Sequence, residues 1–325
     1  MTLASCSTLE ILVLVDNVTD TLSSVPRFVT REFSMLQRRG MRIIAGGSLC
    51  CANHGLSLVI TAHGRGRART LLFDGGPVDY AVERNGTRLG VDFGAIEAAM
   101  LSHGHWDHAG GLPQALAMIR AANGDRQIPL HLHPGMFAER GSKQSDGGVL
   151  PMDPVPSPAR WAQIGADPVV RADTYTVLDD LFWISGEIPR RTDYERGLRN
   201  QVARATPDDP WTPDPLLTDE RALVVRVAGK GLVVFSACSH AGIVNVLHHV
   251  RASFPGERIF AAMGGLHLSG ENEDAISATT RDLADFELTH LFPAHCTGWR
   301  AISALERAFG EPMVAPAAVG KLYTL

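Results

Sequence analysis

The sequence predicts an α/β fold built as one domain with large loops, and three observations indicate it. Apolar runs rich in β-branched residues come first in pairs and then alternate with helix-like segments along the 325 residues. The chain shows no internal repeat at a period of about 20–50 residues. No Pro/Ser-rich linker separates two complete sets of strands and helices, so we expect one domain over 1–325, with pocket-shaping insertions at 20–45 and 141–218.

The N-terminal half begins with strands. The continuous apolar run at 9–15 predicts a buried strand, and the mixed stretch after it contains an amphipathic segment at 28–36 that predicts a helix. Residues 56–61 and 70–73 predict two paired strands, because a turn rich in Gly and Arg joins them. The same patterns predict helices at 93–100 and 112–122 and a strand at 128–132.

Two polar stretches interrupt the second half of the chain. Residues 141–175 are rich in Gly, Pro and Asp, which predicts irregular structure, and residues 187–218 look like an insertion over one face. A Gly-Lys-Gly turn at 229–231 joins two apolar runs, which predicts a hairpin. The expected elements are strands at 180–185, 222–227, 232–236, 258–262 and 289–293, and helices at 243–253, 273–286 and 298–309, followed by a C-terminal tail.

Charge, hydropathy and cysteine usage exclude several classes of protein. The 30 Lys and Arg against 35 Asp and Glu give a formal net charge of −5, without the basic excess of a nucleic-acid-binding protein. No apolar stretch approaches the ~20 residues that cross a bilayer. The five cysteines are odd in number and lack Cys-x-x-Cys spacing, which argues against a disulfide framework and fits a reducing compartment. We expect a cytoplasmic protein that acts on a small molecule, without nucleic-acid or membrane partners, and a homo-oligomer stays open.

Four side chains that can bind metal fall within six residues of one predicted loop. The segment at 101–112 contains His103, His105, Asp107 and His108 in the pattern His-x-His-x-Asp-His, followed by Gly-Gly. Imidazole and carboxylate together suit zinc, iron or manganese. One ion could take the first two histidines and a second ion the Asp-His pair, as in two-metal hydrolytic sites. A polar turn with incidental histidines is the plain alternative, which this density of ligands disfavours.

This segment resembles the signature of the metallo-β-lactamase superfamily. The run Leu-Leu-Phe-Asp-Gly-Gly at 71–76 is similar to the Asp-bearing strand end that precedes the signature in that superfamily. Further segments resemble the dihydropterin-ribofuranosyl-aminobenzene-phosphate synthase-like branch, so the resemblance runs from residue 9 to about residue 305. These segments lie at 16–17, 54–57, 185–190, 237–245, 264–268 and 294–298.

The resemblance implies an αβ/βα four-layer sandwich, in which two mixed β-sheets are flanked by helices. It also implies two divalent metal ions between the two halves, zinc first, with manganese or iron as alternatives. His295 matches the position of the superfamily's final ligand. The strand end at 235–240 matches the position that usually supplies a bridging Asp, but the local sequence is Ser-Ala-Cys-Ser-His. Cys238 or His240 would then serve there, with His240 favoured by the branch.

The usual mid-chain histidine ligand has no obvious counterpart near 180–220. Glu187, Asp219 or Glu220 could take that place, or could instead contact a ligand or the substrate. The resemblance implies a different role for Asp74, which would orient a ligand loop rather than bind the metal. The missing mid-chain histidine departs from the superfamily's pattern and leaves open whether both metal positions are filled.

Several other residues are candidates for the pocket. His54 could line it, and His267, which follows a Gly-Gly pair, could be a ligand or contact the substrate. The chain has no Gly-x-Gly-x-x-Gly or Walker loop to bind a phosphate, so Arg190, Arg191 and Arg196 could bind one instead.

These residues favour a metal-dependent hydrolase. A metal-bound hydroxide would attack an ester, lactone, amide, phosphoester or activated ether. Asp107 and His108 would be catalytic, and the carboxylate of Asp107 could pass a proton to the leaving group. The first alternative is a pterin-pathway-type synthase or transferase that acts on a phosphate-bearing substrate. The second is a non-catalytic metal-binding sensor or partner subunit, which the missing bridging Asp keeps open.

Overall fold

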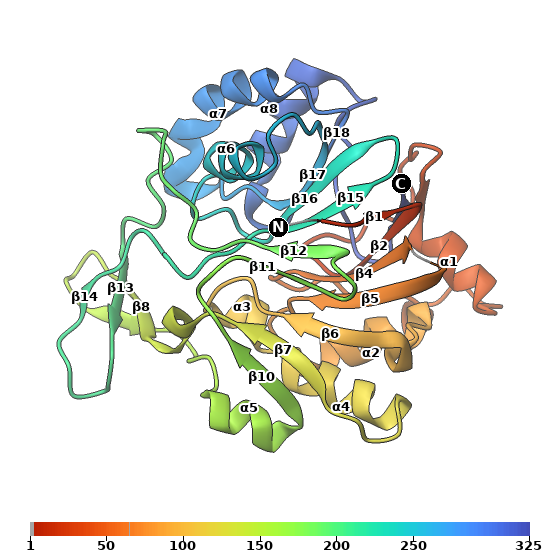
Figure 1. Cartoon of the computed structure of the whole chain (residues 1–325), viewed down its shortest axis with the longest axis horizontal. Coiled ribbons are helices and arrows are strands. Elements are labelled where there is room, and N and C mark those ends of the chain that lie inside the picture. Colours follow the sequence, from red (N-terminus) through yellow and green to blue (C-terminus); the bar gives the residue numbers. More distant parts are fainter. Residues whose placement is uncertain (1–2, 65) are drawn as a thin grey trace.

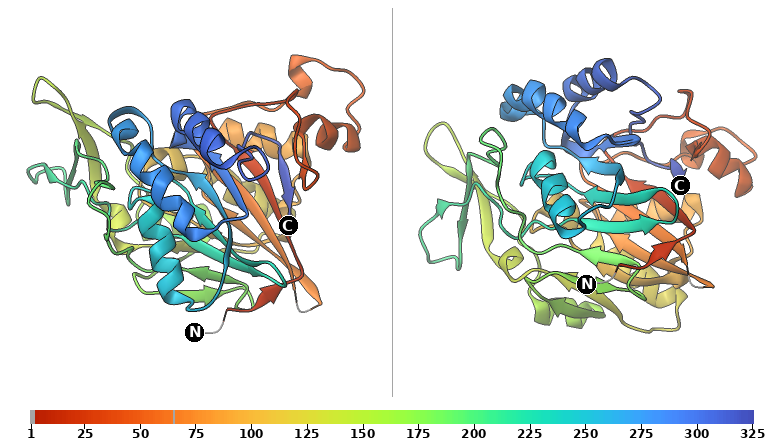
Figure 2. Two further views of the ribbon diagram at one scale, coloured as in Figure 1. Left: turned by 90° about the horizontal axis from the view of Figure 1, so that it is seen from above. Right: turned by 45° about the horizontal axis from the view of Figure 1, so that its top comes forward.

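The computed structural model describes residues 3–64 and 66–325. Two large sheets pack face to face, and helices cover their outer sides (Figure 1). In Figure 1, α6, α7 and α8 lie above the sheet that contains β15–β18, and α2, α4 and α5 lie below the sheet that contains β4–β7. The two views of Figure 2 show the same layers from other directions. The arrangement is the predicted αβ/βα sandwich.

The first sheet is built mainly from the N-terminal half. Over the described residues its strand order is β10-β7-β6-β5-β4-β2-β19-β3, and the C-terminal strand β19 returns to pair with β2 and β3. Its strands are β2 (Thr8–Val15), β3 (Val29–Thr30), β4 (Ser57–Gly64), β5 (Arg67–Phe73), β6 (Ile96–Met100), β7 (Ile128–Leu132), β10 (Ala166–Val170) and β19 (Leu322–Thr324). Its helices are α1 (Glu32–Arg38), α2 (Asp79–Leu89), α3 (Trp106–Ala109), α4 (Leu112–Ala122) and α5 (Pro158–Ile164).

The second sheet comes mainly from the C-terminal half. Its order in the described part of the chain is β11-β12-β15-β16-β17-β18, with β1 added in parallel to β15. The pairs β16–β17 and β17–β18 are parallel, so their carboxyl ends meet at one edge. The strands are β1 (Ser5–Cys6), β11 (Tyr175–Val177), β12 (Phe182–Ile184), β15 (Leu223–Val227), β16 (Gly231–Ser236), β17 (Ile259–Gly265) and β18 (His290–Ala294), and the helices are α6 (Ile243–Ser253), α7 (Ile276–Leu283) and α8 (Trp299–Phe309).

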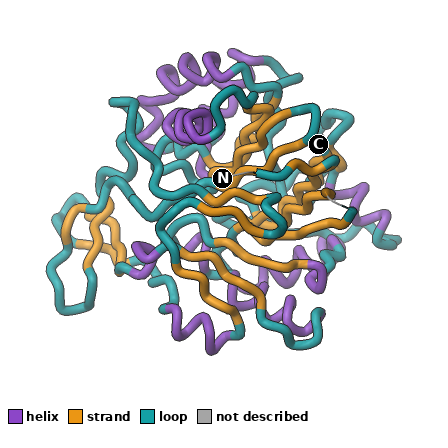
Figure 3. The backbone as a smooth tube through the Cα atoms, in the orientation of Figure 1, coloured by secondary structure: helices purple, strands orange, loops and turns teal. Residues whose placement is uncertain are grey.

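A third, small sheet stands away from the sandwich and is called the small sheet below. Its order is β14-β13-β8-β9 among the described residues. Figure 3 shows its short strands at the outer end of long loops. The strands are β8 (Glu139–Lys143), β9 (Val149–Pro151), β13 (Gln201–Arg204) and β14 (Thr212–Pro213). The stretch predicted as the insertion 141–218 therefore supplies most of this sheet.

The apolar core lies between the two large sheets. Phe73 of the first sheet and Phe235 of the second meet there with ring centroids 6.3 Å apart, and both side chains are buried. Two further apolar clusters lie between each sheet and its helices. This double coverage explains why the run at 9–15 is almost continuously apolar, since a strand covered on both faces has no solvent side. Over the residues described, we find no helix long and apolar enough to span a bilayer.

Most predicted elements are present in the structure. The strands predicted at 9–15, 56–61, 70–73 and 128–132, the 222–236 hairpin and the helices at 112–122 and 243–253 are confirmed. The helix predicted at 273–286 is α7 with a 3-10 turn at each end, Gly270–Ala275 and Ala284–Phe286.

Three predictions of local structure are wrong. Residues 93–100 form a short 3-10 turn and strand β6 rather than a helix, because Ile96–Met100 lies between β5 and β7 in the sheet and tertiary packing overrides the helix preference of Ala. The stretch 141–175 is irregular over 152–157, where prolines cluster, but it also contains β9, α5 and β10, and Ser157 caps α5 while Pro158 occupies its first turn. The C-terminal tail contains β19, and α2 was missed.

Candidate metal centre

The candidate site lies where strands of both large sheets end. The segment 103–108 follows β6 of the first sheet. His240, His267 and His295 follow β16, β17 and β18 of the second sheet. The carboxyl ends of these parallel strands meet at one edge, which brings the loops together although they are far apart in the sequence.

Three imidazoles form what we call the first ligand group: His103, His105 and His240. His103 Nε2 lies 3.1 Å from His105 Nδ1 and 3.1 Å from His240 Nε2. All three side chains are buried, and one ring nitrogen of each lies within 4.8 Å of the others. The group therefore offers three nitrogen donors around one point.

A carboxylate and two imidazoles form the second ligand group: Asp107, His108 and His295. Asp107 Oδ2 lies 3.2 Å from His295 Nε2 and 3.7 Å from His108 Nε2. Both of these histidine nitrogens are buried and make no hydrogen bond to any described residue. His54 lies on the solvent side of this group, with its side chain 60% exposed and its Nε2 3.6 Å from Asp107 Oδ2.

Asp74 orients histidines of both groups. It follows β5 with a φ of 60°, and its carboxylate accepts hydrogen bonds of 2.7 Å from the Ser102 amide, from Ser102 Oγ and from His108 Nδ1. Because Ser102 Oγ donates to Asp74, it accepts from His103 Nδ1 at 2.8 Å. The Nε2 atoms of His103 and His108 therefore both face the site, and that of His103 is unprotonated, so Asp74 orients one ring directly and the other through Ser102.

The loop between His103 and His105 is held by residues of the small sheet and of the segment after it. Asp219 accepts the Gly104 amide at 2.8 Å, and Arg140 donates to the Gly104 carbonyl at 3.0 Å. Gln201 Oε1 lies 2.6 Å from His105 Nε2. Asp219 is thus a support of the ligand loop, and its oxygens lie outside the ligand groups among the described residues.

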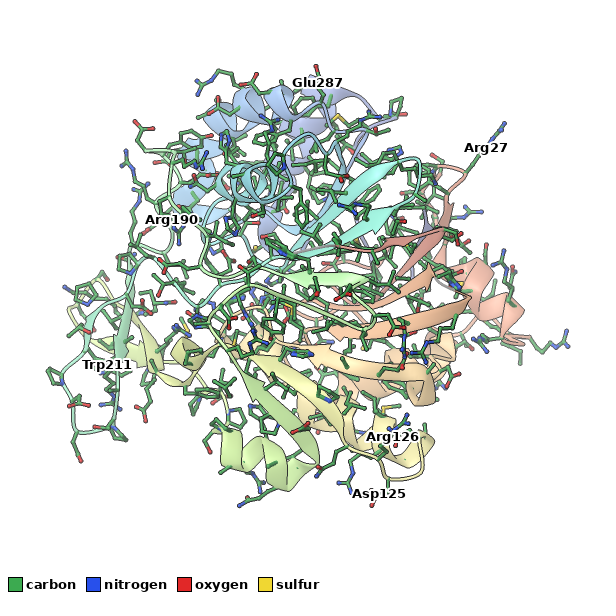
Figure 4. The ribbon with its side chains drawn as sticks, in the orientation of Figure 1. Arg27, Asp125, Arg126, Arg190, Trp211 and Glu287 are labelled. Carbon is green, nitrogen blue, oxygen red and sulfur yellow. The ribbon has the colours of Figure 1, made fainter. Side chains whose placement is uncertain are left out.

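The backbone at His240 is fixed by two charged residues. Glu220 accepts the amides of His240 and Ala241 at 2.8 and 2.6 Å, and burial raises the pKa of Glu220 to about 6. Arg190 donates to the carbonyls of His240 and Leu216, so its guanidinium supports this loop (Figure 4 shows Arg190 on the long loop beside α6). Glu187 is exposed and joins no ligand group among the described residues.

Asn17 orients the second ligand group. Its Oδ1 accepts from the Gly55 amide at 3.0 Å and from His295 Nδ1 at 2.9 Å. Its Nδ2 therefore donates, to His54 Nδ1 at 3.2 Å and to the His295 carbonyl. The neighbouring Asp16 accepts the His295 amide at 2.7 Å, and burial raises the pKa of this carboxyl to about 6.

Cys238 lies after β16, within the segment 235–240 that the resemblance matches to the bridging Asp. Its Sγ lies 3.0 Å from Cys296 Sγ, and both thiols are buried. Cys238 falls in one possible ligand set with two histidines of the signature and in another with His240 and His267. His267 Nδ1 accepts from Asn272 at 2.8 Å, so this ring is anchored at the margin of the site.

Burial shapes the electrostatics of the histidines. It lowers the pKa of His105 and of His295 to about 4 each, although Asp107 beside them raises it. The pKa values of His103 and His240 lie well below the ordinary value for the same reason, and neighbouring imidazoles lower them further. These four rings are neutral near pH 7, which is the form that binds metal.

The pair Asp107 and His108 has the opposite balance. Burial alone would lower the pKa of His108, but the carboxylates of Asp107 and Asp74 raise it above its ordinary value. Burial raises the pKa of Asp107, yet His108 and His295 lower it by more, so the carboxyl is ionised. The second group therefore holds a negative charge and an imidazole that retains a proton without metal.

The donor set fits divalent transition-metal ions. His103 Nδ1 donates a hydrogen bond to Ser102 Oγ, and His105 Nε2 donates one to Gln201 Oε1. His103 Nε2 and His105 Nδ1, which face each other at 3.1 Å, therefore both carry lone pairs. Two lone pairs at this distance repel unless a cation lies against both. Neutral imidazoles with one carboxylate suit zinc, iron or manganese.

The structure brings together the signature residues with those of two distant loops. Ligand-type atoms converge from His103, His105, Asp107, His108, His240 and His295, with Cys238, His267 and His54 at the margin. The orienting residues Ser102 and Gln201 were not anticipated. Asn17 and Ser102 lie in the segments 16–17 and 101–112 that the sequence analysis singled out, without an assigned role, whereas Gln201 had no signal in the sequence.

The chain has the fold of the metallo-β-lactamase superfamily, as its signature segment predicted. Tm1679, a metal-dependent hydrolase of the β-lactamase superfamily, superposes with a TM-score of 0.67 at 22% identity and covers 98% of each chain. Yeast PDE1 superposes with a TM-score of 0.54 at 10% identity, over 98% of this chain and 100% of that one.

Sequence comparison adds curated relatives, although no protein-family model matches the chain. The chain is 26% identical over 274 residues to 7,8-dihydropterin-6-methyl-4-(β-D-ribofuranosyl)-aminobenzene-5′-phosphate synthase of Methanocaldococcus jannaschii, which covers 80% of this chain and 86% of the relative. An uncharacterised protein of the same organism is 25% identical over 79% of this chain and 88% of its own length. The first similarity is consistent with the branch to which the sequence segments pointed.

Proposed function

We propose that the protein is a metal-dependent hydrolase that holds two divalent ions, zinc in the first place, and acts on a small molecule. One observation carries the proposal: six side chains from three loops direct ring nitrogens or carboxylate oxygens toward two adjacent points, and four of the five histidines are oriented by a hydrogen bond on the far side of the ring. A histidine cluster without metal would not need such orientation.

Each ligand group would hold one ion. His103, His105 and His240 would hold the first, and Asp107, with His108 and His295, the second. When bound, such ions supply Lewis acidity, which polarises a carbonyl or phosphoryl oxygen and makes water a stronger nucleophile at neutral pH. Cys238 stands between the groups, within reach of ligands of both.

The chain's own residues would move the proton. The close contacts of Asp107 to imidazoles involve Oδ2, so Oδ1 is the atom that would take a proton from the attacking water and return it to the leaving group. His54 carries its proton on Nε2 when neutral, because Asn17 donates to Nδ1. It therefore presents an N–H toward Asp107 on the side that faces solvent.

Metal analysis and substrate screening test the proposal together. We expect two equivalents of metal per chain, turnover of at least one ester, lactone, amide or phosphoester, and loss of both after chelation. The double variant His103→Ala/His105→Ala should lose one equivalent and at least about 1,000-fold in kcat/KM. The matched control is His63→Ala, because His63 pairs with Glu10 far from the site. Full metal content with full activity in the double variant would contradict the proposal.

The similarity to the synthase favours a second candidate, a transfer reaction on a phosphate-bearing substrate. Arg190 supports the His240 loop, whereas Arg191 and Arg196 are exposed and could bind a phosphate, although Arg196 Nε also donates to the Asp193 carbonyl at 3.0 Å. Reaction in ¹⁸O-labelled water separates the two candidates. Hydrolysis places the label in the product, while transfer to another acceptor leaves it out. Full metal content without either activity would favour the non-catalytic sensor instead.

A further inference from the structure

We infer that Gln201 of the small sheet is a positioning residue for the metal centre, because it determines which ring nitrogen of His105 faces the first ligand group. The functional meaning rests on the proposed metal centre. The effect of Gln201 on the His105 ring does not, since it is a property of the chain without metal.

The hydrogen bonds of Gln201 leave one orientation for its amide. Gln201 Nε2 lies 3.2 Å from the Asp214 carbonyl and 3.1 Å from Asp214 Oδ2, and both of these atoms only accept. Oε1 therefore faces His105 Nε2, at 2.6 Å. Since Oε1 is an acceptor, His105 Nε2 carries the proton, and His105 Nδ1 keeps its lone pair for the ligand group.

The anchor of Gln201 is itself fixed by a buried arginine. Arg140 of β8 donates from Nε to Asp214 Oδ2 at 3.1 Å and from Nη2 to Asp219 Oδ1 at 2.5 Å. It also holds the carbonyl of Gly104, where an added Cβ would lie 2.2 Å from Arg140 Nη1. Arg140 is 4% exposed, so its charge depends on these partners.

The small sheet thus contacts the ligand loop in two places. Arg140 from β8 holds the backbone between the two histidines, and Gln201 from β13 holds the ring of His105. A loss of either contact would let the ring turn away from the first group. Partners of this kind change metal affinity by about 10–100-fold. The small sheet is therefore part of the proposed metal-binding machinery.

Nitrogen NMR of the metal-free full-length chain tests the assignment directly. With ¹⁵N-labelled histidine, the His105 ring is identified by its loss in His105→Gln. We expect the Nε2–H tautomer in the wild type. In Gln201→Leu we expect a mixture of tautomers. The pair Gln201→Glu with Asp214→Asn reverses donor and acceptor between these two residues and should restore the Nε2–H form.

Metal titration against a competing chelator supplies the second readout. Gln201→Leu should weaken one of two zinc equivalents by about 10–100-fold, and the paired variant should recover most of this loss. Gln144→Leu is the matched control, because Gln144 lies in the exposed turn between β8 and β9 of the same sheet. An Nδ1–H tautomer in the wild type, or unchanged tautomer and affinity in a folded Gln201→Leu, would overturn the inference. A Gln201-dependent tautomer in a chain that binds no zinc would support the positioning of His105 and overturn the proposed function.

Discussion

The two ligand groups differ in their donors and in their access to solvent. The first consists of three buried imidazoles, and the pKa of each is lowered. The second contains an ionised carboxylate, an imidazole with a raised pKa, and a neighbour, His54, whose side chain is 60% exposed. The first group is therefore suited to hold a cation firmly, and the second to exchange protons with substrate and solvent.

The groups also differ in what supports them. Residues of the small sheet hold the first group at His105, whereas Asp16 and Asn17 at the end of β2 hold the second at His295. Among the described supports, Asp74 serves both groups, through His108 directly and through Ser102 to His103. The comparison predicts that the two ligand groups can be changed separately, except through the carboxylate of Asp74.

The largest effect is expected from a replacement of Asp74, because this residue supports both ligand groups. In Asp74→Asn, an amide nitrogen would face one of the donors that the carboxylate now accepts, which disturbs His108 directly and His103 through Ser102. We expect both zinc equivalents to weaken by over about 100-fold. The free energy of unfolding should fall by about 2–4 kcal/mol, because a buried charged acceptor is lost. Chelator competition and urea unfolding measure these changes, with the exposed Asp153→Asn as control. Weakening of only one equivalent would contradict a shared role for Asp74.

A pair of single replacements sharpens the comparison. His240→Ala removes a donor of the first group, and His295→Ala removes one of the second. Each variant should retain one tight metal equivalent and lose the other, and both should lose at least about 100-fold in kcat/KM. Titration of the metal-free variants with zinc provides the measurement. If either replacement releases both metals, the six residues form one cooperative site rather than two groups.

The sequence analysis located the site better than it explained the site. The segment 101–112 concentrates its ligands within a few residues, so chemistry and spacing alone indicated a metal. Residues such as Gln201 act through contacts made only in the folded chain, and an isolated Gln in a polar stretch carries no local signal. The same limit applies to β6, since its Ala-rich sequence favours a helix until neighbouring strands enclose it. His240 was expected near a bridging position, yet its ring joins the first group, because the loop after β16 is held by Glu220.

A smaller effect is expected on acidification, because the two ligand groups should lose their metal at different pH values. A ligand binds metal only without its proton. The pKa of His105 is about 4, so protons compete for the first group only near that pH. The pKa of His108 is raised above its ordinary value, so protons compete with metal for the second group as soon as the pH falls below neutral. Between pH 8 and pH 4 we expect the second equivalent to dissociate first, as measured by metal content after dialysis. Simultaneous loss of both equivalents would contradict the difference in pKa.

The smallest expected effect concerns His54, which tests where the second group ends. Its Nε2 lies 3.6 Å from Asp107 Oδ2, near enough for a role in proton transfer and also near enough for a ligand. The hydrogen bond from Asn17 Nδ2 occupies Nδ1 and leaves the proton on Nε2, which disfavours the ligand role. His54→Ala should therefore keep both zinc equivalents within about 3-fold of wild-type affinity, while kcat falls by about 10-fold through slower proton transfer. The decrease should be partly reversed by added imidazole, which can donate the missing proton from solution. Loss of a zinc equivalent would instead make His54 a ligand, and the second group would then extend to the solvent-exposed edge of the site.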